Sequence, residues 1–226
     1  CVQRGAEKLG DATLNVPGKH NVSNALGVIA LATELGVAFD KIAKSLGTFR
    51  HARRRFEIKY QSERFLLVDD YAHHPTEIRA TLATARSAGR KRVLTMFQPH
   101  RFTRTKALRK EFGGAFDNSD HVVVTDVYAA SEAPIPGISG QTIADELAQH
   151  GHRGVSYQPR IDRVHCDIGN MVDAGDLVLS LGAGNIHEQL SLLAADLVIV
   201  ENLKAIVGEE GEVRLYEPMA KHTTLR

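Results

Sequence analysis

Side chains that can do chemistry gather just after the apolar runs that are predicted to be β-strands. Carboxylates, histidines, arginines and tyrosines dominate segments 69–77, 98–105 and 126–132, and the short segment Gly182-Ala183-Gly184-Asn185 follows the last such run. In open α/β sheets, ligands bind in the crevice beyond the carboxyl ends of the strands. The segments are therefore predicted to meet at one edge of a sheet and to form a ligand site there.

The first segment offers carboxylates and two adjacent histidines. A carboxylate at the end of a buried strand needs hydrogen-bond donors, and ribose hydroxyls are one natural pair, so Asp70 is interpreted as a nucleotide contact. The alternative is that Asp69 or Asp70 caps the helix predicted from Pro75, although both lie rather far upstream. His73 and His74 match no metal-ligand spacing, so no metal site is predicted. One structural and one substrate-facing histidine are expected instead.

The second segment contains two arginines three positions apart, Arg101 and Arg104. On one side of a nascent helix their guanidinium groups can bind a carboxylate or a phosphate together. Lys106, Arg109 and Lys110 follow, and we interpret these three as a solvated basic surface.

Gly182 and Gly184 lie between a predicted strand and a predicted helix, which fits either a close backbone approach to a ligand or a tight turn. The third glycine of a dinucleotide-binding fingerprint is missing. The sequence also lacks Gly-x-x-x-x-Gly-Lys-Ser/Thr, the usual phosphate loop. This chain alone is therefore not expected to hydrolyse ATP.

Strands and helices alternate from residue 55 onward. Strands are predicted at 65–69, 92–97, 121–126, 155–157 and 177–181, and helices at 75–87, 105–116, 140–150, 161–172 and 186–195. This alternation predicts an α/β fold with a mostly parallel sheet covered on both faces. The run 55–60 is predicted to add an antiparallel edge strand. Two helices split at Gly36 are expected in 21–46, and a linker is expected from Glu201.

Composition excludes several classes of protein. The 226 residues carry 28 Lys and Arg against 27 Asp and Glu, so no global field attracts nucleic acid or an anionic membrane. No apolar run reaches the ~20 residues of a membrane helix. Cys1 and Cys166 have no paired spacing, which favours a reducing cytoplasm. Because the sequence begins with Cys1 and not with Met, the chain is expected to be part of a longer protein.

Three segments together resemble the Mur ligase family of peptidoglycan synthesis. They are 17–24 (PGKHNVSN), 69–77 (DDYAHHPTE) and 97–105 (FQPHRFTRT), with further similarity in 54–57 and 126–129. The resemblance implies that 1–48 end a central ATPase domain and that 49–198 form a C-terminal Rossmann-like domain. It also implies an ATP-dependent ligase that adds L-alanine to UDP-N-acetylmuramate through an acyl phosphate, and an isolated chain that is inactive.

Carried over motif by motif, the resemblance implies two groups of site residues. Those for ATP are His20 and Asn24 at adenine, Asp70 at the ribose, and Arg54 or Arg55 at the phosphates. Those for L-alanine are Tyr71, His73, His100, Arg101 and Arg104, with the arginines on its carboxylate and the histidines as candidate catalytic residues. The family's Mg²⁺ ligands would lie outside this chain.

Segment 217–226 (EPMAKHTTLR) resembles the start of the flavin-dependent UDP-N-acetylenolpyruvoylglucosamine reductases. Residues 199–226 are accordingly expected to be a linker and the start of a following domain, in which any FAD would bind. Three rival functions stay open: a ligase that recycles a tripeptide, a nicotinamide-dinucleotide-binding domain, and a non-catalytic nucleotide-binding module.

Overall fold

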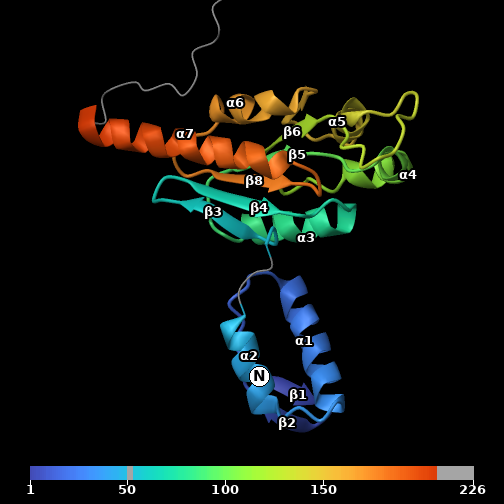
Figure 1. Cartoon of the computed structure of the whole chain (residues 1–226), viewed down its shortest axis with the longest axis vertical. Helices are drawn as coiled ribbons and strands as arrows, with labels where there is room; N and C mark the ends of the chain where they lie inside the picture. The colour runs from blue at the N-terminus through green and yellow to red at the C-terminus, as the bar shows by residue number, and fades with distance from the viewer. Residues whose placement is uncertain (50–52, 208–226) are drawn as a thin grey trace, which may run out of the picture. The chain divides into compact units, whose positions relative to one another are not determined.

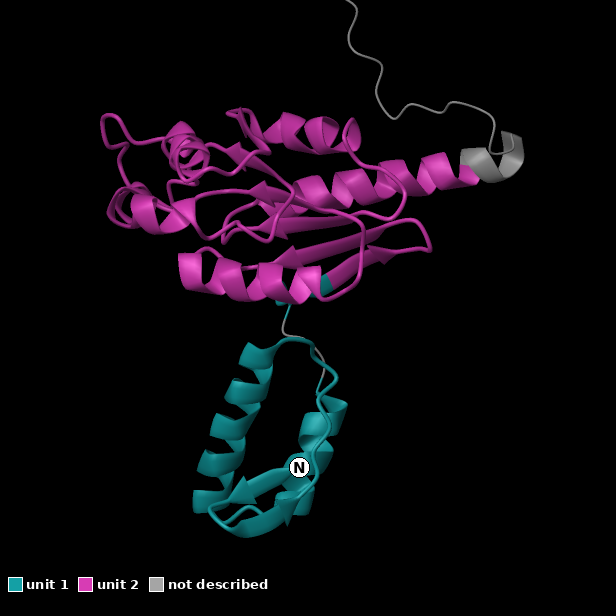
Figure 2. Ribbon diagram, turned by 180° about the vertical axis from the view of Figure 1, so that it is seen from behind, with its two compact units in different colours: residues 1–57 teal, residues 58–226 magenta. Residues whose placement is uncertain are grey.

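The computed structural model describes residues 1–49 and 53–207, and the chain divides into two compact units, Cys1–Glu57 and Ile58–Arg226 (Figure 2). The division lies nine residues after the boundary expected at 48/49. What each part belongs to in a longer protein stays a prediction. The segment that resembles the reductase, 217–226, lies outside the described residues.

Unit 1 is a β-hairpin packed against two helices. The strands are β1 (Val2–Arg4) and β2 (Glu7–Gly10), and the helices are α1 (Lys19–Glu34) and α2 (Phe39–Thr48). Gly36 has a φ of 79° between the helices, which confirms the predicted split. Val2, Ile29 and Ile42 form a small apolar core. The hairpin was not predicted, because its two short strands carry no clear apolar alternation.

Unit 2 contains a six-stranded sheet in the order β3-β4-β8-β5-β6-β7. The strands are β3 (Glu57–Gln61), β4 (Leu66–Asp70), β5 (Val93–Phe97), β6 (His121–Thr125), β7 (Val155–Gln158) and β8 (Leu177–Leu181). All neighbouring pairs from β4 to β7 are parallel. A connection of only four residues joins β3 to β4, closed by a backbone hydrogen bond from Ser62 to Phe65 of 2.9 Å. Such a short connection permits only an antiparallel pair, so the edge strand agrees with the prediction.

Five α-helices and a short 3₁₀ turn alternate with these strands. The helices are α3 (Pro75–Arg86), α4 (Phe102–Gly113), α5 (Gly140–Gln149), α6 (Val164–Gly169) and α7 (Ile186–Val207), and the 3₁₀ turn η1 (Ile161–Arg163) precedes α6. The helix predicted from 161 to 172 is thus a 3₁₀ turn followed by a shorter α-helix.

Helix α7 passes both its predicted end at 195 and the start of the linker predicted from Glu201. No glycine or proline interrupts 186–207, so nothing local stops the helix. The Glu201 carboxylate accepts a hydrogen bond from Ser62 Oγ at 2.9 Å and another from the Tyr60 hydroxyl. Glu201 is therefore part of the folded unit, and the prediction of a linker from this residue was wrong.

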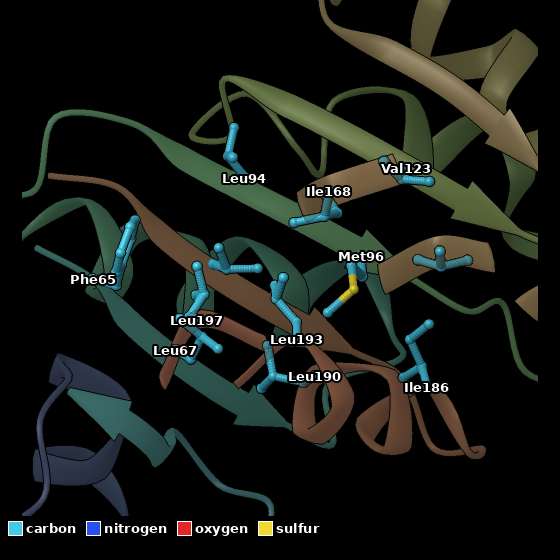
Figure 3. Packing of buried hydrophobic residues seen from close by; sticks show 12 residues of the cluster. Phe65, Leu67, Leu94, Met96, Val123, Ile168, Ile186, Leu190, Leu193 and Leu197 are labelled. Carbon is cyan, nitrogen blue, oxygen red and sulfur yellow. The ribbon is translucent and has the colours of Figure 1, made fainter. Parts of the chain in front are cut away.

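The sheet has helices on both faces, as predicted. Helices α3, α4 and α5 follow crossovers that run in one direction across the sheet, and right-handed crossovers place such helices on one face. Helices α6 and α7 cover the opposite face, where Ile168, Leu190 and Leu193 pack against strand residues such as Leu67 and Met96 (Figures 1 and 3).

The strand order has a direct consequence for function. Strand β8, the last in the chain, lies between β4 and β5, which are the first two parallel strands. Strand order reverses at this point, and ligands bind at such switch points in open α/β sheets. The loops that follow β4, β5 and β8 therefore leave the sheet side by side.

Candidate functional site

Four rings from three loops form a continuous row at the carboxyl ends of the strands. Tyr71 and His73 meet edge to face with centroids 5.4 Å apart, and His73 lies 5.8 Å from His100. His100 stacks on Tyr128 at 5.5 Å with 12° between the ring planes. The rings follow β4, β5 and β6, so the predicted convergence of the loops is confirmed.

The two adjacent histidines have different surroundings. His74 is the N-cap of α3, and its Nδ1 accepts a hydrogen bond of 3.3 Å from the Thr76 amide. Glu77 completes a capping box by accepting from the amides of His73 and His74 at 3.1 and 3.2 Å. The His73 ring lies beside His100, and its Nδ1 is 2.9 Å from the carbonyl oxygen of Tyr71 and 3.5 Å from Oε2 of Glu77. One histidine is thus structural, as predicted, and the substrate-facing role of His73 stays a prediction.

Asp69 and Asp70 are buried, with exposed fractions of 0% and 4%. Asp69 accepts a hydrogen bond of 2.6 Å from Ser180 Oγ on β8. Asp70 accepts one of 2.8 Å from the amide of Ala72, which folds the loop after β4. The alternative that one of them caps α3 is wrong, because His74 occupies that position. A ribose contact by Asp70 stays a prediction.

The arginine pair is arranged differently from the prediction. Arg101 is the N-cap of α4, with φ 71° and ψ 134°, so it lies outside the helix. The expectation that Arg101 and Arg104 share one side of a helix was therefore wrong, because that relation requires both to be helical. Arg104 lies in the first turn, and its Nη1 is 3.3 Å from Nδ1 of His100. A carboxylate role for the two arginines stays a prediction.

His100 lies at the centre of the charged groups. Its pKa is lowered, first by burial and then by the positive charges of Arg104, His73 and Arg101, while Glu132 acts in the opposite direction. A lowered pKa favours the neutral imidazole at neutral pH, and a neutral imidazole can accept a proton. His100 has the chemistry of a base or of an orienting hydrogen-bond partner.

The glycine turn after β8 approaches protein side chains closely. A Cβ on Gly184 would lie 2.3 Å from Oε1 of Gln98 and 2.7 Å from Cγ of Tyr128. The Gln98 side chain in turn donates to Asn185 at 3.1 Å and accepts from the Ile186 amide at 3.2 Å, which holds the start of α7. Of the two interpretations of this turn, the geometric one is supported.

Three contributors to the site were not predicted: Gln98, Tyr128 and Glu132. Glu132 accepts hydrogen bonds from the amide and the hydroxyl of Thr103 at 3.0 and 2.7 Å. All three lie in segments that were predicted to converge. Their position just after predicted strands was therefore the one sequence feature that could have pointed to them. Their partners could not be identified, because they lie in other loops.

The residues assigned to adenine and phosphate belong to unit 1. His20 and Asn24 lie on α1, where His20 is partly buried and Asn24 is exposed. Arg54 has a φ of 59°, and its amide donates to Oε2 of Glu57 at 2.8 Å. Roles for these residues and for Arg55 in binding ATP stay predictions.

The described residues contain no group of three or more His, Cys, Asp and Glu side chains that is placed to hold a metal ion. Within the same residues, no helix is both long and apolar enough to cross a membrane.

The model of the family described as "Mur ligase, glutamate ligase domain" matches residues 54–184, more than half of the chain. The chain belongs to the Mur ligase family. The match begins just before β3 and ends in the glycine turn after β8, so it includes the whole row of rings.

Curated relatives of this Mur ligase chain carry the name UDP-N-acetylmuramate–L-alanine ligase. The protein of Syntrophotalea carbinolica is 49% identical over 182 residues, which are 80% of this chain and 40% of the relative. That of Solibacter usitatus is 47% identical over 180 residues, or 80% and 38% of the two chains. The chain thus spans about two fifths of the length of these relatives.

Solved structures agree with this family assignment. UDP-N-acetylmuramate-alanine ligase MurC from Thermotoga maritima is 30% identical, with a TM-score of 0.70 over 90% of this Mur ligase chain and 42% of that chain. The murein peptide ligase mpl from Psychrobacter arcticus is 23% identical, with a TM-score of 0.63 over 81% and 38%. The second likeness concerns the fold alone.

Proposed function

We propose that this chain is part of a cytoplasmic, ATP-dependent ligase that joins L-alanine to UDP-N-acetylmuramate. The observation that carries the proposal is the cluster of His73, His100 and Arg104 at the switch point of the sheet. The guanidinium group of Arg104 can bind the carboxylate of an amino acid, and the imidazoles of His73 and His100 can hydrogen-bond with its amine. The names of the relatives at 47–49% identity support this choice of substrates.

In the proposed reaction, the amine of L-alanine attacks the acyl carbon of a muramoyl phosphate that ATP has formed. The C–N bond forms, the bond from carbon to the phosphate oxygen breaks, phosphate leaves, and the amine loses a proton. Arg101 and Arg104 hold the alanine carboxylate, and His73 or His100 orients the amine or accepts its proton. Alignment of this kind is worth about 7–11 kcal/mol of barrier in favourable cases.

The proposal assigns contacts with ATP to His20, Asn24, Arg54, Arg55 and Asp70. Mg²⁺ is expected with ATP, and its ligands would lie outside this chain, since no cluster of metal ligands occurs among the described residues. A following FAD domain would depend on 217–226, which lie outside the described residues.

The test uses the full-length protein that contains this chain. Release of ADP is measured with UDP-N-acetylmuramate and with L-alanine, the tripeptide or no acceptor. We expect release to depend on L-alanine. Preference for the tripeptide would indicate the recycling ligase, and binding of NADH in a titration without ligase activity would indicate the nicotinamide-dependent rival. Either result would refute the proposal.

A further inference from the structure

The loop 126–132 is joined to the segment that carries His100 and Arg101. The Tyr128 amide donates to the carbonyl of Pro99, and the Arg101 amide donates to the carbonyl of Tyr128, both at 2.8 Å. His100 and Tyr128 form a parallel bridge, and their rings stack. Main chain and side chains of this loop thus fix the residues just before α4.

Glu132, at the end of this loop, holds the first turn of α4. Its two carboxylate oxygens accept from the amide and the hydroxyl of Thr103. These hydrogen bonds are the main cause of its lowered pKa, with a smaller contribution from Arg101. The N-cap residue Arg101 makes no capping hydrogen bond with its own side chain. Glu132 therefore supplies from another loop the anion that a helix N-terminus favours.

The same region contains three residues other than glycine with positive φ. They are Arg101 at 71°, Ala130 at 48° and Ser131 at 70°. Such conformations cost free energy, cluster at functional sites, and persist only where the surrounding structure determines them. For Arg101 the surrounding structure is the loop 126–132 on one side and Thr105 on the other, whose amide and hydroxyl both donate to the Arg101 carbonyl at 3.0 and 2.8 Å.

We propose that Glu132 is a positioning residue that holds Arg101 and Arg104 for the carboxylate of the incoming amino acid. The proposal rests on the function proposed above and adds a residue to the group assigned there to L-alanine. Glu132 acts through Thr103, which lies between the two arginines in the chain. Glu132 is an anion, so its charge stabilises segment 101–104, which contains the two arginines. Glu132 itself is not one of the residues assigned to the substrate.

The rival explanation is that Glu132 only stabilises the fold. The two explanations differ in what they predict for kinetics. A purely structural residue would alter the amount of folded enzyme and leave both KM values unchanged. A positioning residue raises KM for the amino acid and leaves KM for ATP as it was.

The main experiment compares Glu132→Gln in the full-length ligase with Glu111→Gln, which removes an exposed carboxylate from α4, the helix whose first turn Glu132 holds. For Glu132→Gln we expect KM for L-alanine to rise about tenfold, because displaced arginines make weaker charge-assisted hydrogen bonds with the alanine carboxylate. KM for ATP should stay within about twofold, and Glu111→Gln should match the wild type. Glu132→Asp keeps the charge and should restore much of the lost affinity.

A second measurement follows the pKa of His100 by NMR. The groups that act on His100 are Arg104, His73 and Arg101, which lower its pKa, and Glu132, which raises it. Glu132→Gln should therefore lower the His100 pKa further, whereas Glu111→Gln should not change it. Glu132→Gln removes this charge whatever the role of Glu132, so the shift checks that the carboxylate acts on His100, and the two KM values decide its role.

A third variant tests the proposal if Glu132→Gln folds poorly. Thr103→Val keeps the carboxylate and removes the hydroxyl that donates to it. It should raise KM for L-alanine in the same direction, by a smaller factor. Unchanged alanine KM in both variants, in an active wild type, overturns the role of Glu132 and leaves the ligase proposal intact. A wild type without alanine-dependent ADP release overturns the ligase proposal instead.

Discussion

At the scale of single residues, the conformation of Arg101 has the largest consequence. Its φ of 71° lies where a Cβ is unfavourable, yet the position carries arginine and not glycine. The fold therefore accepts strain at a residue whose positive charge acts on His100. The strain is in the backbone, whereas the proposed function belongs to the guanidinium group. Different substitutions can therefore remove one without the other.

Two substitutions of Arg101 make this separation. Arg101→Ala and Arg101→Gly both remove the guanidinium group, and only the glycine variant relieves the backbone. Relief of about 1–2 kcal/mol, less the ~0.5–1 kcal/mol entropic cost of glycine, should make Arg101→Gly more stable than Arg101→Ala by up to about 1.5 kcal/mol. Urea unfolding of both variants measures this difference. A more stable alanine variant would show that the backbone is not strained.

Arg104 is predicted to act on the acceptor and not on the nucleotide. Loss of a charge-assisted hydrogen bond costs about 1.5–3 kcal/mol, so Arg104→Ala in the full-length protein should raise KM for L-alanine roughly 10- to 100-fold. KM for ATP should change far less. Lys106→Ala, on the exposed surface of the same helix, is the matched control. Equal effects on both KM values would contradict the assignment of Arg104.

At the scale of elements, helix α7 buries one face and exposes the other. Leu190, Leu193 and Leu197 are fully buried against the sheet, while the neighbouring Leu192 is 47% exposed (Figure 3). This spacing is that of one helical face. The helix also fixes the glycine turn after β8 through Gln98, so its packing contributes to the geometry of the site.

Adjacent leucines in α7 provide a matched pair for a stability measurement. Leu193→Ala should lower the free energy of unfolding by about 2–5 kcal/mol, because it leaves a cavity in the core. Leu192→Ala should stay within about 0.5 kcal/mol of the wild type. Denaturant unfolding of the two variants measures which face of α7 is buried. A comparable loss in both would mean that Leu192 is covered in solution.

At the scale of the whole molecule, stability is predicted to depend on pH through two histidines. Burial is the main cause of the lowered pKa of both His100 and His121, and positive neighbours add to it, Arg104 for the first and His152 for the second. Their folded pKa values lie below the ordinary 6.5. The unfolded chain therefore takes up protons before the folded protein does, and stability falls as pH drops below about 6.5.

Urea unfolding between about pH 8 and pH 5 measures this dependence. The free energy of unfolding should be level above about pH 7 and should decrease below about pH 6.5. His121→Asn should flatten part of that decrease, because it removes the partly buried imidazole, whose Nε2 hydrogen-bonds with Oγ of Ser156. An unchanged slope in this variant would exclude His121 as a contributor. Glu132 and Asp162, whose pKa values are lowered, act only at still lower pH.

The sequence by itself determined the kinds of element in unit 2 and their order. Strands β5 and β8 and helix α3 begin and end within one residue of the prediction, because apolar periodicity, the Pro75 start and polar loops are local signals. It also determined that the chemistry lies after the strands, since parallel strands end at a common edge.

Only the tertiary structure decided which of these loops meet. Strand order is a long-range property, and β8 between β4 and β5 could not be inferred from any local pattern. That order brings His73 to His100, and it aligns Tyr128 and Glu132 with the segment before α4. The positive φ of Arg101 is likewise set by partners in another loop, because arginine has no preference of its own for that conformation.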